Sequence, residues 1–186
     1  MRGKLIAIAA SLALALSACS TTKVFMSHPA MVKTEIDSHA KVYFLREMPQ
    51  RTRGIADDDL RIEVGEQPLL FLARGEYSLV RFKPGRYDVV VHSKTMLTTN
   101  PAPVEVWRSR PFEFAAGQSY YILTRSYQEE WRGFYFVPES IGEGEAKSLS
   151  RHMAAAGELT EAQPLYVPPP DIEPEPFDPV ADALSK

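Results

Sequence analysis

Between residues 41 and 138 the chain consists of short runs rich in β-branched and aromatic residues, separated by Gly, Pro, Asn and Asp. Several runs alternate between apolar and polar positions. In LRIEV (60–64) the leucine, isoleucine and valine fall on one face, and RYDVVVH (86–92) and PFEFA (111–115) follow the same pattern. A period of two predicts strands with one buried face and one wet face, as in antiparallel sheets. Short strands at regular spacing are typical of a sandwich or barrel.

Two other runs are apolar on both faces. They are KVYFLRE (41–47) and SYYILTR (119–125). A strand that is buried on both faces lies inside a sheet that is covered on both sides. We therefore expect both runs to form central strands.

A turn signal occurs in KPGR (83–86). In a type II turn, Pro84 would preset φ and Gly85 would take the positive φ. The pattern predicts a hairpin that joins a strand over 76–82 to a strand over 86–92.

The pattern changes after Pro138. Apolar side chains then recur at helical spacing, and Ser140 with Glu143 resembles a capping box. Gly157 is a suitable residue just beyond a helix end. The sequence thus predicts one amphipathic helix over 139–158 that packs on the sheet. Residues 159–186 are rich in proline and acids, which predicts a disordered tail.

The expected fold is mainly β: an antiparallel sandwich, Ig-like or prealbumin-like, with one C-terminal helix. No internal repeat is evident beyond the rhythm of the strands. The predicted parts are a cleaved signal peptide (1–18), a lipidated N-terminus and tether (19–40), the sandwich (41–138), the helix (139–158) and the tail (159–186).

The N-terminal residues have the pattern expected of an export signal. Arg2 and Lys4 precede an apolar run of 12 residues at 5–16. Such a run fits a signal peptide, whereas a helix that spans the hydrocarbon core needs about 20 apolar residues. Three interpretations arise: a membrane span, an ordinary secretion signal or a lipid-anchor signal. The span is disfavoured by length, and a plain secretion signal leaves the odd thiol of Cys19 unexplained.

The order Leu16-Ser17-Ala18-Cys19 resembles the lipobox of bacterial lipoproteins. The resemblance implies cleavage before Cys19, a diacylglycerol (and palmitate-type acylation) on this cysteine, and a permanent membrane tether. Cys19 is the only cysteine of the chain, so its lipidation would leave neither a free thiol nor a disulfide. Ser20, where an Asp would favour inner-membrane retention, favours the periplasmic side of the outer membrane.

The net charge of the chain without its predicted signal peptide bears on whether nucleic acid or anionic lipid could be a partner. Without 1–18 the chain keeps 19 of its 21 Lys and Arg against 24 Asp and Glu, a net charge of −5. Nucleic-acid binding calls for a basic patch, so no nucleic acid is expected. The net charge gives no reason to lie on anionic headgroups either. The membrane partner is expected through the lipid.

A family resemblance rests on KVYFLRE (41–47), the segment 63–91 with its Pro-Gly turn, and FAAGQSYYILTR (114–125), followed by a helix. These motifs resemble a family of small bacterial lipoprotein domains of unknown function, over roughly 41–155. The resemblance implies a fold but no catalytic residue. The Pro-Gly turn also resembles that of carbohydrate-associated sandwich modules.

Catalytic signatures are lacking. There is no G-x-S-x-G or H-E-x-x-H motif, and the histidines at 28, 39, 92 and 152 are scattered, so we expect no zinc and no cofactor. The acidic run 57–59 is best interpreted as a solvated loop balanced by Arg51, Arg53 and Arg61, because consecutive carboxylates cannot all face one calcium ion.

Aromatic residues supply the remaining candidates. Either they pack the core or they line a glycan-binding face; the set is Trp107, Tyr120, Tyr121, Trp131, Tyr135 and Phe136. Trp131 and Arg132 lie at an expected loop, and Trp and Arg are common anchors of interfaces. We expect a non-enzymatic envelope module that binds a protein or the cell wall, with Trp131, Arg132 and Trp107 as contact residues. A glycan-binding module is the alternative, and a carboxylate-based hydrolase is less favoured.

Overall fold

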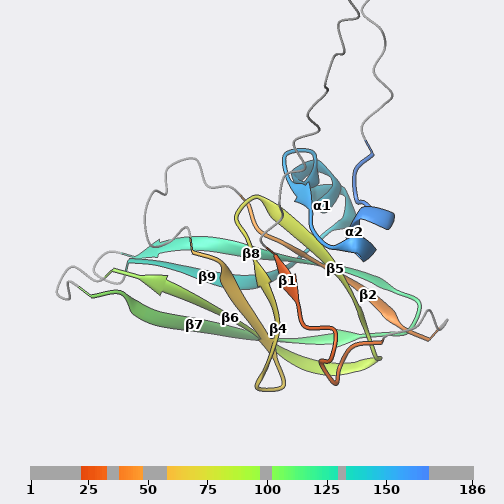
Figure 1. Ribbon diagram of the computed structural model, residues 1–186, viewed down its shortest axis with the longest axis horizontal. Coiled ribbons are helices and arrows are strands. Elements are labelled where there is room, and N and C mark those ends of the chain that lie inside the picture. The colour runs from red at the N-terminus through yellow and green to blue at the C-terminus, as the bar shows by residue number, and fades with distance from the viewer. Residues whose placement is uncertain (1–21, 33–37, 48–57, 97–101, 130–132, 168–186) are drawn as a thin grey trace, which may run out of the picture.

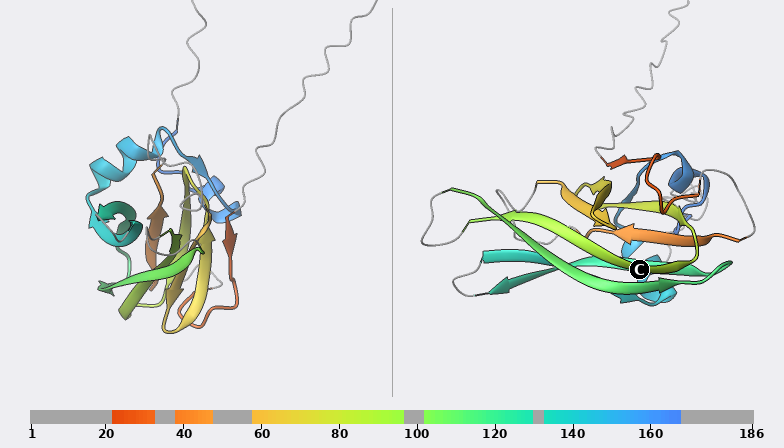
Figure 2. Two further views of the ribbon diagram at one scale, coloured as in Figure 1. Left: turned by 90° about the vertical axis from the view of Figure 1, so that its left-hand side faces the viewer. Right: turned by 90° about the horizontal axis from the view of Figure 1, so that it is seen from below.

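The computed structural model describes residues 22–32, 38–47, 58–96, 102–129 and 133–167. They form two five-stranded sheets packed face to face, with two short helices at one side (Figures 1 and 2). The predicted β-sandwich is confirmed. The predicted signal peptide, Cys19, Ser20 and the tail from residue 168 lie outside the described residues. None of the helices described is long and apolar enough to cross a bilayer.

The first sheet is antiparallel throughout. Its strand order is β1 (Lys23–Val24), β4 (Gln67–Leu72), β3 (Leu60–Val64), β6 (Gly85–Thr95) and β7 (Val104–Phe114). The alternation predicted for β3 is confirmed, because its three apolar side chains are buried between the sheets. Alternate side chains of each strand therefore form an outer face that is turned away from the core.

The second sheet is mixed. Its order is β10 (Ala154–Ala155), β5 (Glu76–Phe82), β2 (Ala40–Leu45), β8 (Ser119–Glu129) and β9 (Gly133–Ile141). β2 pairs parallel with β8, and β10 pairs parallel with β5. The prediction that β2 and β8 are interior strands is confirmed, since both have neighbours on each side.

Two apolar clusters hold the layers together. One fills the space between the sheets and includes Phe44, Phe82 and Phe114, all at most 1% exposed. The other lies between the outer face of the second sheet and the helices α1 (Glu143–Ser150) and α2 (Glu158–Ala162). Each face of β2 therefore has its own core, which explains why its sequence is apolar on both sides.

The predicted hairpin at 83–86 is wrong. β5 belongs to the second sheet and β6 to the first, so the Pro-Gly segment carries the chain from one layer to the other. Gly85 has a φ of 153°, far from the value near +80° of a type II turn. The alternating pattern does not distinguish two arrangements of β5 and β6. Their apolar side chains can be buried both when the strands are neighbours in one sheet and when they lie in two sheets that face each other.

The C-terminal helix is shorter than predicted. α1 ends at Ser150, because residues 154–155 pair with the edge of β5 as β10. Gly157 precedes α2 with a φ of 91° instead of following the first helix. Residues 159–167, assigned to the tail, are also placed on the domain: Tyr43 donates a hydrogen bond to the carbonyl of Gln163, and Leu165 is buried.

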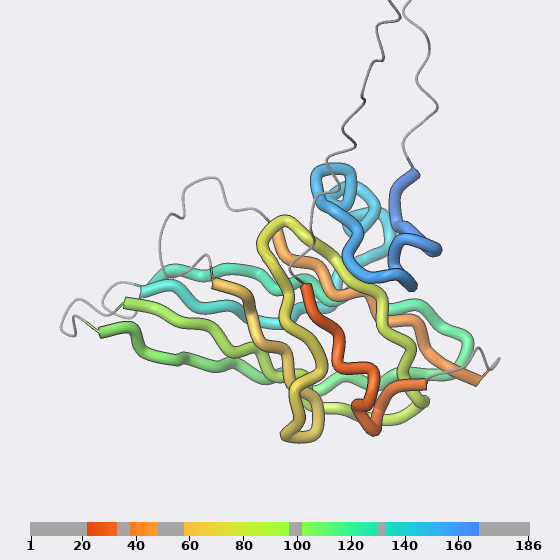
Figure 3. The backbone as a smooth tube through the Cα atoms, in the orientation of Figure 1, coloured from red at the N-terminus to blue at the C-terminus, as the bar shows by residue number. Residues whose placement is uncertain are grey.

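Residues 22–32, assigned to the tether, lie along both sheets (Figure 3). β1 pairs with β4, while Met31 forms a bridge to Phe82 in the second sheet. The physical reason is burial: Ala30 and Met31 join the cluster between the sheets. This segment, the N-terminal strap, is part of the folded domain.

Candidate binding face on the first sheet

The outer face of the first sheet carries one row of side chains across all five strands. Strand register places them directly opposite one another, in the order Lys23, Phe71, Arg61, His92 and Trp107. Four strand spacings give the row a length of about 19 Å. The described residues place no helix on this face, whereas α1 and α2 cover the outer face of the second sheet. Within the described part of the chain, the row therefore lies on a sheet face that no helix covers.

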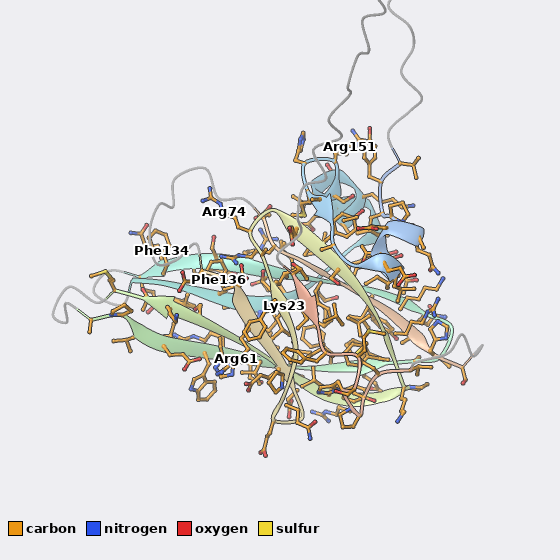
Figure 4. All side chains as sticks on the ribbon, viewed as in Figure 1. Lys23, Arg61, Arg74, Phe134, Phe136 and Arg151 are labelled. Atoms are coloured by element: carbon orange, nitrogen blue, oxygen red, sulfur yellow. The ribbon has the colours of Figure 1, made fainter. Side chains whose placement is uncertain are left out.

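An ion network holds the middle of the row. Arg61 Nε lies 3.1 Å from Glu63 Oε1, and Arg61 Nη2 lies 2.8 Å from Glu105 Oε1. Arg61 Nη2 also lies 3.0 Å from His92 Nδ1, and His92 Nε2 lies 2.9 Å from Glu63 Oε2. The two ring nitrogens of His92 thus contact Arg61 and Glu105 on one side and Glu63 on the other. The four side chains brace one another across β3, β6 and β7; Figure 4 labels Arg61.

Trp107 stands beside this network with most of its surface in solvent. Its side chain is 61% exposed, although it is opposite the half-buried His92. At the other end of the row, the rings of Phe25 and Phe71 lie 5.7 Å apart between centroids, and Phe25 is 38% exposed. The face thus offers aromatic surface at both ends and charged groups between them.

A second polar cluster lies on β8 and β9. The rings of Tyr127 and Tyr135 stack at 5.7 Å. Tyr127 donates a 2.5 Å hydrogen bond to Glu139, and Arg125 Nε donates one of 2.8 Å to the other oxygen of the same carboxylate. Arg125 Nη2 also donates to Glu145 of α1 at 3.0 Å. The cluster ties the first turn of α1 to the sheet, which is a structural role.

These contacts move pKa values in matching directions. The hydrogen bond from Tyr127, with the bond and charge of Arg125, lowers the pKa of Glu139. The same hydrogen bond to Glu139 raises the pKa of Tyr127. In the apolar cluster between the second sheet and the two helices, burial raises the pKa of Tyr43 to about 12.

Among the predicted contact residues, only Trp107 lies in the described part of the chain. Trp131, Arg132, Cys19 and Ser20 lie outside it. The six aromatic residues considered for core packing or for a glycan-binding face differ in their burial. Phe136 is buried between the sheets, Tyr120 and Tyr121 pack against the cores, Tyr135 is half-buried and Trp107 is exposed.

Three of the four histidines lie within the folded domain, and the acidic run pairs with a partner other than the one predicted. His28 and His39 are buried at 6% and 7% exposure, and His92 lies inside β6. His28 is held by the carbonyl of Val64 and the amide of Ala30. Asp58 pairs with Lys94 at 3.0 Å, not with Arg61.

The ion network left no signal in the sequence. Its four members come from three strands, so only the register brings them together. In the described residues, no group of three His, Cys, Asp or Glu is placed to hold a metal ion.

No family model matches the chain, and comparisons with curated proteins and with solved structures give no match either. Any function assigned to the protein therefore rests on its sequence, its fold and the geometry of the open face.

Proposed function

We propose that the protein is a lipid-anchored, non-enzymatic binding module of a bacterial cell envelope, facing the periplasm. Its ligand is a protein partner that docks on the outer face of the first sheet around Trp107. The observation that carries the proposal is the exposure of Trp107 at 61% on a face that no described helix covers.

The physical argument concerns the cost of exposed aromatic surface. A tryptophan left in water forfeits the burial that its large ring would gain in a core, while Trp and Arg are the side chains that most often dominate binding interfaces. Trp107 and Arg61 flank His92 in one row. The ion network also holds the face in shape, so a partner loses little free energy in ordering it.

The anchor rests on the sequence. The short apolar run, the lipobox-like order and the single cysteine all favour lipidation of Cys19. Cys19→Ser should abolish incorporation of a radioactive fatty acid and release the protein from the membrane fraction. Continued labelling of this variant would refute the anchor.

The docking face is tested by cross-linking in cells. Trp107→Ala should remove at least one envelope protein from the cross-linked neighbours of the wild type. Met96→Ala is the matched control, because Met96 is also an exposed apolar side chain, at 50%, outside the row. If Trp107→Ala kept every neighbour seen with Met96→Ala, the docking face would be wrong.

A cell-wall glycan is the second candidate ligand. An exposed indole is a flat surface on which a sugar ring can stack, and the adjacent Arg61, Glu63 and Glu105 supply donors and acceptors for hydroxyl groups. In a pull-down with purified cell-wall material, a glycan ligand predicts that Trp107→Phe keeps binding and Trp107→Ala loses it. Equal recovery of both variants would exclude the glycan.

A carboxylate hydrolase is less favoured. Glu63 and Glu105 flank His92, so two acids do lie close together. Both already contact Arg61, and Glu105 is 54% exposed on an open sheet face. Two acids across a cleft that holds the substrate, as glycoside hydrolysis requires, are not what these residues form.

A further inference from the structure

The first described residue is fixed firmly to the domain. Thr22 Oγ1 donates a 2.5 Å hydrogen bond to Glu76 Oε2 and accepts one of 3.0 Å from the amide of Ala73. The amide of Thr22 also donates to Glu76 Oε2, at 3.3 Å. β1 begins at the next residue, with Lys23 opposite Phe71. From Thr22 onward the backbone is therefore held against the domain.

The N-terminal strap then stays bound over its whole length. The amide of Phe25 donates to the carbonyl of Leu69 at 2.8 Å, and that of Val32 donates to the carbonyl of Arg81 at 2.9 Å. Thr22 is consequently a fixed point of the sandwich and not a residue of a tether.

This fixed point lies only three residues after Cys19. Three residues span at most about 10 Å when fully extended. If the acyl chains of Cys19 lie in a bilayer, the domain cannot stand away from it. We propose that the end of the domain around Thr22 docks directly on the bilayer that holds the lipid anchor, an inference that rests on the proposed function.

Two turns share this end with Thr22. The β4–β5 turn (73–75) meets it through Ala73, and the turn at 151–153 lies alongside, because the amide of Ala154 donates to the carbonyl of Gly75 at 2.9 Å. We call Thr22 and these two turns the anchor end.

The charge of the anchor end suits phospholipid headgroups. Arg74 and Arg151 lie in its two turns and are labelled at the upper side of the domain in Figure 4, and Lys23 follows Thr22. Two acids also lie here, Glu76, which accepts the hydrogen bond of Thr22, and Glu47, which follows Arg46 beside the β4–β5 turn. The three basic side chains outnumber these two acids by one. Although the chain has a net negative charge, this end presents local positive charge, which favours contact with anionic lipid.

The proposal fixes which parts face away from the bilayer. β4 runs from Gln67 to Leu72 toward the anchor end. Five residue steps along a strand cover about 17 Å, so Gln67 should lie that much farther from the membrane. Docking at Thr22 thus holds the domain with the β3–β4 turn outward.

The test measures distance from the membrane surface. Mature acylated protein carries one added cysteine, Arg151→Cys at the anchor end or Gln67→Cys at the far turn, labelled with a fluorophore. Cys19 in its lipidated form has no free thiol, so each label is specific. In phospholipid vesicles with nitroxide-labelled headgroups, we expect quenching at 151 to exceed quenching at 67 several-fold. Arg74→Cys provides a second anchor-end probe in case one variant folds poorly.

Two further results decide the outcome. Insertion of a flexible 16-residue Gly-Ser segment between Ser20 and Thr21 should reduce quenching at 151 to the level at 67, while the protein still floats with vesicles. Equal quenching of 151 and 67 in the protein without the insertion, with flotation intact, would overturn docking and leave the anchor standing. Loss of flotation in the parent protein would instead refute the anchor of the proposed function.

Discussion

At the scale of single residues, one hydrogen-bonded ion network lies on each sheet. Arg61 joins Glu63, Glu105 and His92 on the first sheet, and Arg125 joins Glu139 with Tyr127 on the second. Pairs exposed to this degree stabilise a protein weakly. Their more important effect is to fix side-chain orientations around the exposed rings.

The bond between Tyr127 and Glu139 can be tested by titration. Tyr127→Phe removes the largest influence that lowers the pKa of Glu139, so this pKa should rise toward its ordinary value. NMR titration of the side-chain carboxyl groups would measure it. Tyr135→Phe is the matched control, because Tyr135 donates to Glu129 instead, and it should leave the pKa of Glu139 unchanged.

At the scale of elements, two long hairpins make up one end of the sandwich. β6 and β7 form one, β8 and β9 the other, and they meet where the amide of Phe134 donates to Thr95 Oγ1 at 2.9 Å. Gly133 makes this approach possible. A Cβ there would overlap Thr95 Oγ1 and come within 2.9 Å of the carbonyl of Met96, and its φ is +71°.

Substitution at Gly133 should therefore be costly. Gly133→Ala combines a left-handed backbone, which costs a side-chain-bearing residue about 1–2 kcal/mol, with overpacking, which costs about 1–3 kcal/mol. Gly117→Ala is the control, since its φ is +72° but nothing lies within 4 Å of the added Cβ. Urea unfolding should show the larger loss of stability at Gly133, and equal losses would contradict the packing argument.

Individual strands could be predicted from sequence, but their partners could not. Alternation in β3 and the apolar runs of β2 and β8 follow from which faces are buried, and burial leaves a local trace in the sequence. The assignment of β5 and β6 to different sheets leaves no such trace. For the same reason Trp107 was a candidate from its residue type, while its neighbours His92 and Arg61 became visible only through the register.

At the scale of the whole molecule, the second core makes stability sensitive to alkaline pH. It contains Tyr43 and Tyr77, with Tyr121 packed against it, and burial is the main cause of the raised pKa of each. An acid whose pKa is higher in the folded state keeps its proton longer there than in the unfolded chain. The folded state therefore loses stability as pH rises.

For Tyr43 the window is defined. Its ordinary pKa is 10.0 and its folded pKa is about 12. The contribution is complete below pH 10 and is lost as pH rises through the folded pKa. The urea concentration at half-unfolding, measured at pH 9, 10 and 11, should be lower at pH 11 than at pH 9 or 10. Tyr43→Phe should show a smaller decrease than the wild type. An identical fall in both proteins would exclude Tyr43 as a source.

The parallel pairing of β2 with β8 has a consequence for the time order of folding. Lys41 lies opposite Ser119, so the central strand of the second sheet must wait for a partner that is made much later. A chain that emerges N-terminus first, from a ribosome or through a membrane, cannot close this sheet until more than half of it has appeared. Contacts between such distant segments also slow folding. The second sheet therefore cannot be completed until β8 has emerged, whereas every strand of the first sheet lies before residue 115.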